Sequence, residues 1–347
     1  MGIFEGNYPF MTAYLKGEEA KLVSPEHIER LLRAKDVPEA VEILKDTDIG
    51  NYLDSVLLTS FDEADKALWF YLDDCSRQIA WFHQMPKAMQ KLTDAYMIKY
   101  DVLNIKAALE AVSSGKKVGF IPLGTIYRLG WLGDLGNVQD VAAIKNILVK
   151  CGLDNYAGIV GGYQVDGGAK ERLGVESVLD RQYYAGLFKV ARKVSDRTEL
   201  LRAFGTLMDI RNLKILMRGV ARGRAEDAAY ASVGGGYAIS PEKTQELAAI
   251  RLEEFPARVP YEYQKLTQEM VASYGKNKNI TAIGEIADRY EFGVLHDILS
   301  LKLMSPVMIV WYLILKETEV RNLRLVIRAL FDNVPLEEIK GYLVMTV

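Results

Sequence analysis

A short motif occurs three times in the chain at nearly equal intervals. It reads YDVLNIKAALEAV at 100–112, MDIRNLKILMRGV at 208–220 and TEVRNLRLVIRAL at 318–330. In each copy an acid stands three residues before the asparagine and a cation two residues after it. These signature residues are Asp101, Asn104 and Lys106, then Asp209, Asn212 and Lys214, then Glu319, Asn322 and Arg324. Their recurrence indicates that one unit of roughly 110 residues has been triplicated.

The apolar residues of the motif predict a helix. In the first copy they are Val102, Ile105, Leu109 and Val112, and their spacing of 3, 4 and 3 is typical of a helix that packs on its neighbours. At about 100° per residue, the acid lies at the edge of the apolar stripe and apolar residues flank the asparagine. We therefore expect the asparagine to be buried or half-buried and hydrogen-bonded, and each acid–asparagine pair to fix a junction of helices or of a helix and a loop within its own unit. The alternative is that they are ion ligands or a binding site.

The repeats predict an all-α chain of three tandem, similar helical domains. No segment shows the period-two alternation of a hairpin, whereas helix starts are expected at Ser24-Pro25 and Ser240-Pro241. Helix stops are expected after each motif, at Gly115, Gly223 and Asn333-Val334-Pro335. A glycine-rich segment at 158–174 is predicted to be a mobile loop, and 232–236 a break between domains. The predicted domains are 1–118, 119–236 and 237–334, followed by a closing helix at 335–347.

Composition excludes several classes of protein. The net charge is −3, so there is no basic surplus for binding nucleic acid. The apolar run at 303–315 is shorter than the roughly 20 residues that span a bilayer, and it predicts a buried core helix. No leader pattern precedes the first helix, and Cys75 and Cys151 match no metal or redox spacing. These features favour a reducing compartment with both thiols buried.

Catalytic motifs are not found in the sequence. The three histidines have no zinc-site spacing, and the glycine-rich run at 161–170 lacks the lysine position and the hydroxyl residue of a phosphate-binding loop. We therefore expect no enzymatic activity, no cofactor, no metal and no small-molecule substrate. Arg218, Arg222 and Arg224 end the second motif helix, where cations suit the helix dipole; contact with an acidic partner is the alternative.

The motifs D-x-x-N-L-K-x-L-x-R at 209–218 and E-V-R-N-L-R-x-x-I-R at 319–328 resemble those of the C subunit of prokaryotic V/A-type ATPases, a family that includes the d subunit of the eukaryotic V-type ATPase. The resemblance implies three helical domains in a funnel-like structure. It also implies a non-catalytic rotor subunit between the soluble central shaft and the membrane proteolipid ring. Such a subunit transmits torque for proton or sodium transport and lies peripherally on the cytoplasmic face of the membrane.

The first copy departs from the family motif, because Leu103 and Glu110 stand where the other copies have arginine. Its outward face is therefore expected to meet a different neighbour. The alternative function is a generic helical-repeat scaffold that binds proteins. Solenoid repeats usually run about 20 to 50 residues, so units of this length fit that alternative less well.

Overall fold

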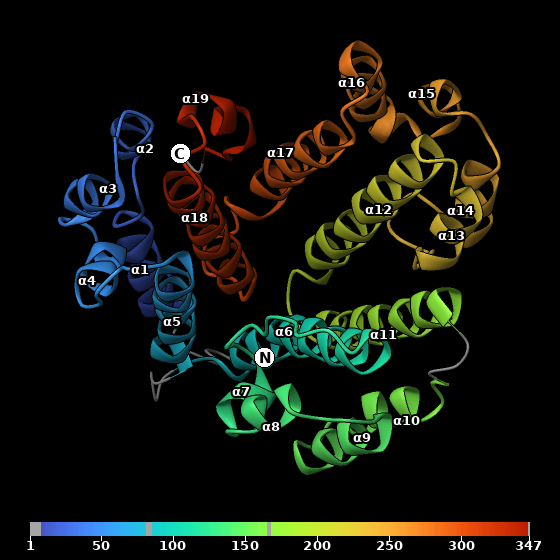
Figure 1. Cartoon of the computed structure of the whole chain (residues 1–347), viewed down its shortest axis with the longest axis horizontal. Coiled ribbons are helices and arrows are strands. Elements are labelled where there is room, and N and C mark those ends of the chain that lie inside the picture. Colours follow the sequence, from blue (N-terminus) through green and yellow to red (C-terminus); the bar gives the residue numbers. More distant parts are fainter. Residues whose placement is uncertain (1–7, 81–84, 165–167, 346–347) are drawn as a thin grey trace, which may run out of the picture. The chain divides into compact units, whose positions relative to one another are not determined.

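The computed structural model describes residues 8–80, 85–164 and 168–345, and within these ranges it contains helices and no β-strand (Figure 1). The all-α prediction is confirmed. The chain divides into two compact units, each described by itself. Unit 1 comprises the residues up to Thr93 and those from Leu299 onward, and unit 2 runs from Asp94 to Ile298. The predicted division into three domains follows the repeats instead, and it stays a prediction.

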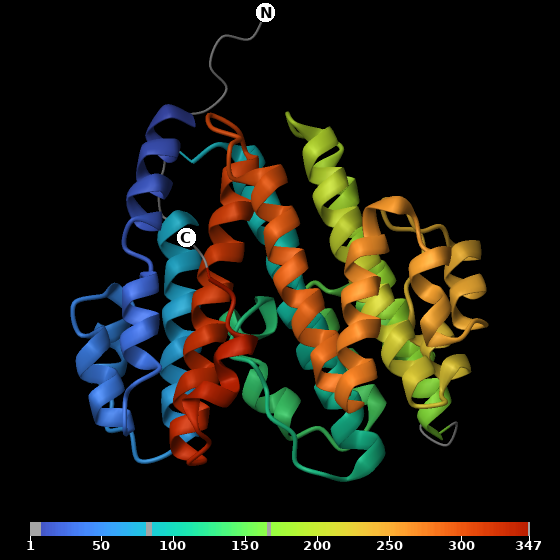
Figure 2. The ribbon, with the colours of Figure 1, turned by 90° about the horizontal axis from the view of Figure 1, so that it is seen from above.

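Unit 1 joins the first helices of the chain to the last ones. Its helices are α1 (Tyr8–Glu19), α2 (Pro25–Leu31), α3 (Val37–Leu44), α4 (Asp48–Asp54), α5 (Phe61–Ala80), α18 (Val307–Phe331) and α19 (Leu336–Ile339), with the 3-10 turn η3 (Lys340–Tyr342). The two longest, α5 and α18, lie side by side in both views (Figures 1 and 2). Residues 307–315 of α18 are all buried, which confirms the predicted core helix over that part of the run. The first four residues of the run, 303–306, are not helical, and Leu303 and Met304 are exposed, because Pro306 disfavours helical backbone in the residue before it.

Unit 2 contains most of α6 and the helices that follow it. These are α6 (Lys87–Ser114), α7 (Thr125–Arg128), α8 (Leu132–Gly136), α9 (Val141–Lys150), α10 (Asp154–Gly161), α11 (Gly168–Ala191), α12 (Arg197–Ala221), α13 (Ala225–Ala231), α14 (Pro241–Ala248), η2 (Leu252–Glu254), α15 (Phe255–Arg258), α16 (Tyr261–Asn277) and α17 (Ile280–Leu299). A core around α12 buries Leu213, Met217, Phe255, Leu266 and Ile283 completely. Each such side chain contributes about 1.5–3 kcal/mol by leaving water.

The helices begin where the sequence predicts. Ser24 caps α2, since its hydroxyl accepts the His27 N–H at 3.2 Å, and Pro25 occupies the first turn. Ser240 caps α14 in the same way, accepting the Lys243 N–H at 3.1 Å. A side-chain oxygen at this position satisfies a backbone donor that the helix itself leaves unpaired.

The three motif helices α6, α12 and α18 also end alike. Just beyond their last turns, Gly115, Gly223 and Asn333 have φ values of 65°, 69° and 53°. This left-handed conformation ends a helix and is the one that glycine, and next asparagine, adopts most easily. The predicted stop signals are confirmed in all three copies.

The glycine-rich segment at 158–174 is not the single long loop that the sequence predicts. Helix α10 continues to Gly161 and α11 starts at Gly168, while residues 165–167 lie outside the described residues. Tyr156, Ala157 and Val160 are buried, and their burial outweighs the roughly 1 kcal/mol that a helical glycine costs. By contrast, residues 232–236 do interrupt the helices, as their glycines predict, and connect α13 to α14.

No described helix is both long enough and apolar enough to cross a bilayer.

Candidate functional site

The acid and the asparagine of every motif are buried. Their exposed fractions lie between 0 and 3% for Asp101, Asn104, Asp209, Asn212, Glu319 and Asn322. A buried carboxylate or amide must find hydrogen-bond partners. In each case, the partners lie on a segment outside the motif helix, and we call each such set of bonds a junction. The prediction that each junction lies within its own repeat unit is wrong for all three acids, because their backbone partners lie at 125–126, 238–239 and 23, beyond the bounds of the unit that holds the acid.

The first junction lies at the start of α7 in unit 2. Asp101 accepts the N–H groups of Thr125 at 2.9 Å and Ile126 at 2.8 Å. Asn104 accepts the N–H of Ile121 and donates to its carbonyl, both at 2.8 Å. Gly124 has φ +90°, and a Cβ there would lie 2.6 Å from Asp101 Oδ1. The close approach of the carboxylate to the backbone therefore requires glycine.

The second junction lies just before α14 in unit 2. Asp209 Oδ2 accepts the N–H of Ala238 at 2.7 Å and the hydroxyl of Tyr263 at 2.9 Å. Asn212 Oδ1 accepts the Val233 N–H at 2.9 Å, whereas its Nδ2 finds no acceptor among the described residues. Burial raises the pKa of Asp209 to about 6, although these donors oppose the shift.

The third junction, in unit 1, joins α18 to both ends of the chain. Glu319 Oε1 accepts the N–H of Val23 at 2.7 Å, one residue before the cap of α2. Asn322 accepts the Val344 N–H at 3.0 Å and donates to its carbonyl at 2.6 Å. The acid thus holds the start of the first copy, and the asparagine holds the C-terminal segment.

A fully buried lysine supports the third junction. Lys316 has no exposed surface, and its Nζ donates to Tyr71 Oη at 2.5 Å. The Tyr71 hydroxyl donates in turn to Glu319 Oε2 at 3.0 Å, and Lys316 Nζ lies 3.4 Å from the same oxygen. Burial, and then the charge of Glu319, raise the pKa of Tyr71 far above its usual value. Beside them, burial raises the pKa of the Cys75 thiol to about 11.

The motif cations pair with acids on other long helices. Lys106 Nζ lies 2.6 Å from Asp180 Oδ2 of α11, where Arg211 of α12 also binds. Lys214 Nζ lies 2.9 Å from Asp288 Oδ1 of α17.

In both pairs the acid follows its lysine by 74 residues. Arg324 of α18 instead binds Asp65 of α5, earlier in the chain, and stacks on Trp69 at 4.4 Å. The pairings therefore follow a cyclic order: first copy with second, second with third, third with first.

The arginines at the end of α12 are not brought into a junction. Arg218 is half-buried and Arg222 is exposed. Arg224 is exposed and pairs with Asp227 at 2.8 Å. Their proposed role in partner contact stays a prediction. In the first copy, Leu103 is 45% exposed and Glu110 pairs with Arg172.

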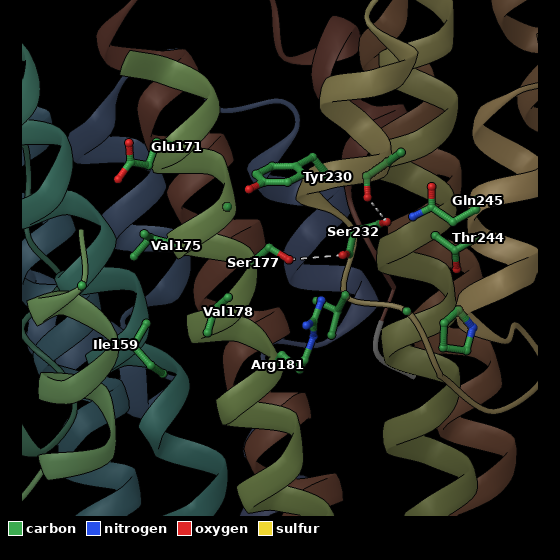
Figure 3. Close-up of a pocket in the computed structure, with 16 residues that line it drawn as sticks. Ile159, Glu171, Val175, Ser177, Val178, Arg181, Tyr230, Ser232, Thr244 and Gln245 are labelled. Carbon is green, nitrogen blue, oxygen red and sulfur yellow. Dashed lines mark hydrogen bonds between the residues drawn. The ribbon is translucent and has the colours of Figure 1, made fainter. Parts of the chain in front are cut away.

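A separate pocket of about 590 Å³ opens in unit 2 between α10, α11, α13 and the start of α14 (Figure 3). On one side, the Ser177 hydroxyl donates to the Ser232 carbonyl at 3.2 Å. The ring of Tyr230 covers Gly174, where a Cβ would lie 2.5 Å from a ring carbon. Arg181 and Glu171 of α11 also line the pocket, so its lining is mixed in charge and polarity. Its volume lies within the range of ligand pockets.

Sequence reasoning missed Lys316 as a functional residue and missed the pocket. The signal for Lys316 was its position three residues before Glu319, which places both on one face of α18. Metal binding has no geometric support in the described part of the chain, which holds no cluster of three or more metal-ligating side chains.

Comparison with known proteins covers all three motif helices. A family model described as ATP synthase (C/AC39) subunit matches residues 11–342. The chain is similar to the C subunit of the A-type ATP synthase of Methanocaldococcus jannaschii, with 27% identity over 97% of this chain and 86% of the relative. The proteins of the same name from Methanothermobacter thermautotrophicus and Pyrococcus furiosus are 22% and 23% identical, over 95% and 96% of this chain and 85% and 89% of the relatives.

Proposed function

Because the chain belongs to the ATP synthase (C/AC39) subunit family, we propose that it is a non-catalytic rotor subunit of a rotary ATPase. In this role it links the soluble central shaft to the membrane proteolipid ring. It lies peripherally on the cytoplasmic face of the membrane and passes torque between ATP turnover and the movement of protons or sodium ions. The relatives support this role, because each is named as the C subunit of an A-type ATP synthase.

The cyclic order in which the motif acids and cations bind the next copy is the observation that carries the proposal. A part that transmits torque must resist shear between its helices, and here each motif helix is bonded to the next copy through buried or half-buried groups. The last one returns to the first through Glu319 and Val23, 296 residues apart. Every copy is therefore tied to another by side-chain bonds as well as by the chain itself.

The energies involved fit this role. Moving one elementary charge across a membrane is worth about 2.3 kcal/mol per 100 mV. Breaking a buried ion pair by removing one partner costs about 3–5 kcal/mol, and leaving a buried hydrogen-bonding group unsatisfied costs about 1–3 kcal/mol. Leaving one of these groups without its partner thus costs as much energy as the movement of one ion supplies.

The test has two parts. An affinity-tagged chain, recovered from detergent-solubilised membranes, should bring down both the shaft subunits and the proteolipid. Membrane vesicles depleted of the chain should hydrolyse ATP without pumping ions, and adding the purified chain back should restore pumping. A stable preparation that contains neither shaft nor proteolipid would contradict the proposal, and so would pumping that does not depend on the chain.

A second candidate is a protein-binding scaffold outside any rotary complex, in which the pocket of unit 2 receives a side chain of the partner. This function predicts that the chain is recovered from the soluble fraction, bound to a partner that is neither shaft nor ring. Size-exclusion chromatography of a soluble extract, followed by mass spectrometry of the fractions that contain the chain, distinguishes the two.

A further inference from the structure

The turn between α17 and α18 exposes an unusual amount of apolar surface. Leu301 is 82% exposed, Leu303 53% and Met304 56%. Single exposed apolar residues are common on protein surfaces, whereas a contiguous group marks an interaction site. We call residues 299–306 the apolar turn.

The apolar turn is held in place rather than loosely attached. Met304 has φ 56°, a left-handed conformation that is strained for a residue of its size. Its N–H donates to the hydroxyl of Thr12 in α1 at 3.1 Å, and that hydroxyl donates to Met308 Sδ at 3.2 Å. In the first turn of α1, Phe10 is a further exposed apolar residue, at 43%. Two segments far apart in sequence therefore meet to display apolar side chains.

The corresponding turn in unit 2 shows that the apolar composition is not needed for the backbone. Between α11 and α12, Asp196 adopts φ 56°, the same conformation as Met304. The residues there, 192–197, read RKVSDR, and aspartate tolerates the left-handed region well. A charged sequence builds this turn with less strain, so the leucines and the methionine at 301–304 require another explanation.

We infer that the apolar turn inserts into the interfacial layer of a lipid membrane. Residues 299–306 and 8–11 contain no acid, and their one charged residue, Lys302, is positive. Basic and apolar groups together suit an anionic lipid surface. A bilayer, unlike a protein partner, needs no matching recess to receive a turn. Protein interfaces favour tyrosine, tryptophan and arginine at their centres; of these, the two segments contain only Tyr8, and tyrosine is enriched at membrane interfaces as well.

This contact goes beyond the proposed rotor function and does not depend on the ring or the shaft. Because few side chains are involved, membrane binding by the isolated chain should be weak and reversible. The turn would then act as an accessory anchor for a chain that protein partners also hold.

Vesicle flotation of the purified full-length chain tests the inference. The chain should float with vesicles of phosphatidylcholine mixed equally with phosphatidylglycerol, and less with phosphatidylcholine alone. The variant Leu301→Ser/Leu303→Ser should bind at least about tenfold more weakly, since a factor of ten needs only about 1.4 kcal/mol. The matched control is Val56→Ser/Leu57→Ser, which removes apolar groups that are 39% and 81% exposed in another loop of unit 1. Thermal unfolding should show that both variants remain folded.

Failure to float, or an equal loss of binding in the control variant, would overturn the inference. A second readout is Leu301→Cys labelled with a polarity-sensitive fluorophore. Its emission should shift to the blue on addition of the anionic vesicles alone. A shift that appears only with shaft or ring proteins would identify a protein contact instead and would also overturn it. The same affinity recovery from membranes, carried out with the Leu301→Ser/Leu303→Ser variant, tests the rotor function separately. If the variant still brings down the shaft and ring subunits, the rotor function stands whether or not the variant binds vesicles.

Discussion

The second and third junctions perform the same task on different stretches of chain. In unit 2, Asp209 and Asn212 of α12 bind a segment that follows within 30 residues. In unit 1, Glu319 and Asn322 of α18 bind Val23 and Val344, which lie near opposite ends of the chain. Chain continuity limits how far both asparagines can separate from their partners, since Asn212 and Val233 are 21 residues apart and Asn322 and Val344 are 22. The acids differ, because Asp209 lies 29 residues from Ala238 whereas Glu319 lies 296 residues from Val23 and depends on its non-covalent contacts.

The third junction contains additional groups that fit this need. Its acid is glutamate, one methylene longer than the aspartates of the other copies, and Lys316 and Tyr71 bind its second oxygen. Asp209 instead receives backbone N–H groups and one tyrosine hydroxyl, and its pKa is raised to about 6. The acid of the third copy is therefore held by a buried ion pair. The acid of the second copy stays near its partners because a short stretch of chain connects them.

The largest expected effect follows from removing the buried cation. Lys316→Met leaves Glu319 buried without its ion pair and should lower the free energy of unfolding of unit 1 by about 3–5 kcal/mol. Lys214→Met is the matched control, because Lys214 and Asp288 are 30% and 29% exposed, and such a pair contributes below about 1 kcal/mol. Denaturant unfolding followed by circular dichroism measures both. Equal losses in the two variants would remove the distinction between the junctions.

The two asparagines should also differ in how much they stabilise the fold, with the larger contribution again in the third junction. Asn322 exchanges two hydrogen bonds with Val344, whereas Asn212 makes one with Val233. Asn322→Leu should therefore cost about 2–3 kcal/mol and Asn212→Leu about 1 kcal/mol. Both substitutions should lower the thermal midpoint without abolishing assembly with partners. If Asn212→Leu keeps its stability but loses partner binding, the residue belongs to a binding surface and not to the framework.

The pH dependence of stability should single out the second junction. The pKa of Asp209 is raised to about 6 in the folded chain, so folding favours its protonated form. Its contribution to the free energy of unfolding is fully present below the unfolded pKa of about 3.9 and is lost as the pH rises through about 6. The total loss is on the order of 3 kcal/mol. Relative to Asp209→Asn, which does not titrate, the wild type should lose stability between about pH 4 and pH 7. Parallel curves of thermal midpoint against pH would contradict the raised pKa.

The smallest effect concerns the helix ends. Asn333 occupies the left-handed position that glycine occupies after α6 and α12. Asn333→Gly should stabilise unit 1 by at most about 1 kcal/mol, since glycine adopts this conformation without strain. The reciprocal change, Gly223→Asn, should cost unit 2 a similar amount. A gain from Gly223→Asn in thermal unfolding would show that neighbouring contacts, and not backbone strain, decide the preference.

The sequence predicted the burial of the motif asparagines, because helical periodicity fixes which face each residue occupies. The acids were expected at the edge of the apolar stripe, and they are buried as well. Their partners could not be predicted, since most are backbone N–H and carbonyl groups such as those of Val23 and Val344, which no side-chain pattern marks. Lys316 stood in the sequence as a charge after an apolar run. Its burial depends on Tyr71, 245 residues away. The pocket was equally hidden, because four helices from separate parts of unit 2 contribute to it.

Because both thiols are buried, the rate at which they are alkylated reports on opening of the fold around them. Cys75 and Cys151 are 5% and 7% exposed, so a maleimide should react first with any cysteine placed on the surface. Cys75 lies beside Lys316 and Tyr71, and its pKa is raised to about 11, so little reactive thiolate forms at neutral pH. Its labelling therefore requires unit 1 to open. The rate at which Cys75 is alkylated would measure how often the third junction opens, with and without the partners of the proposed rotor.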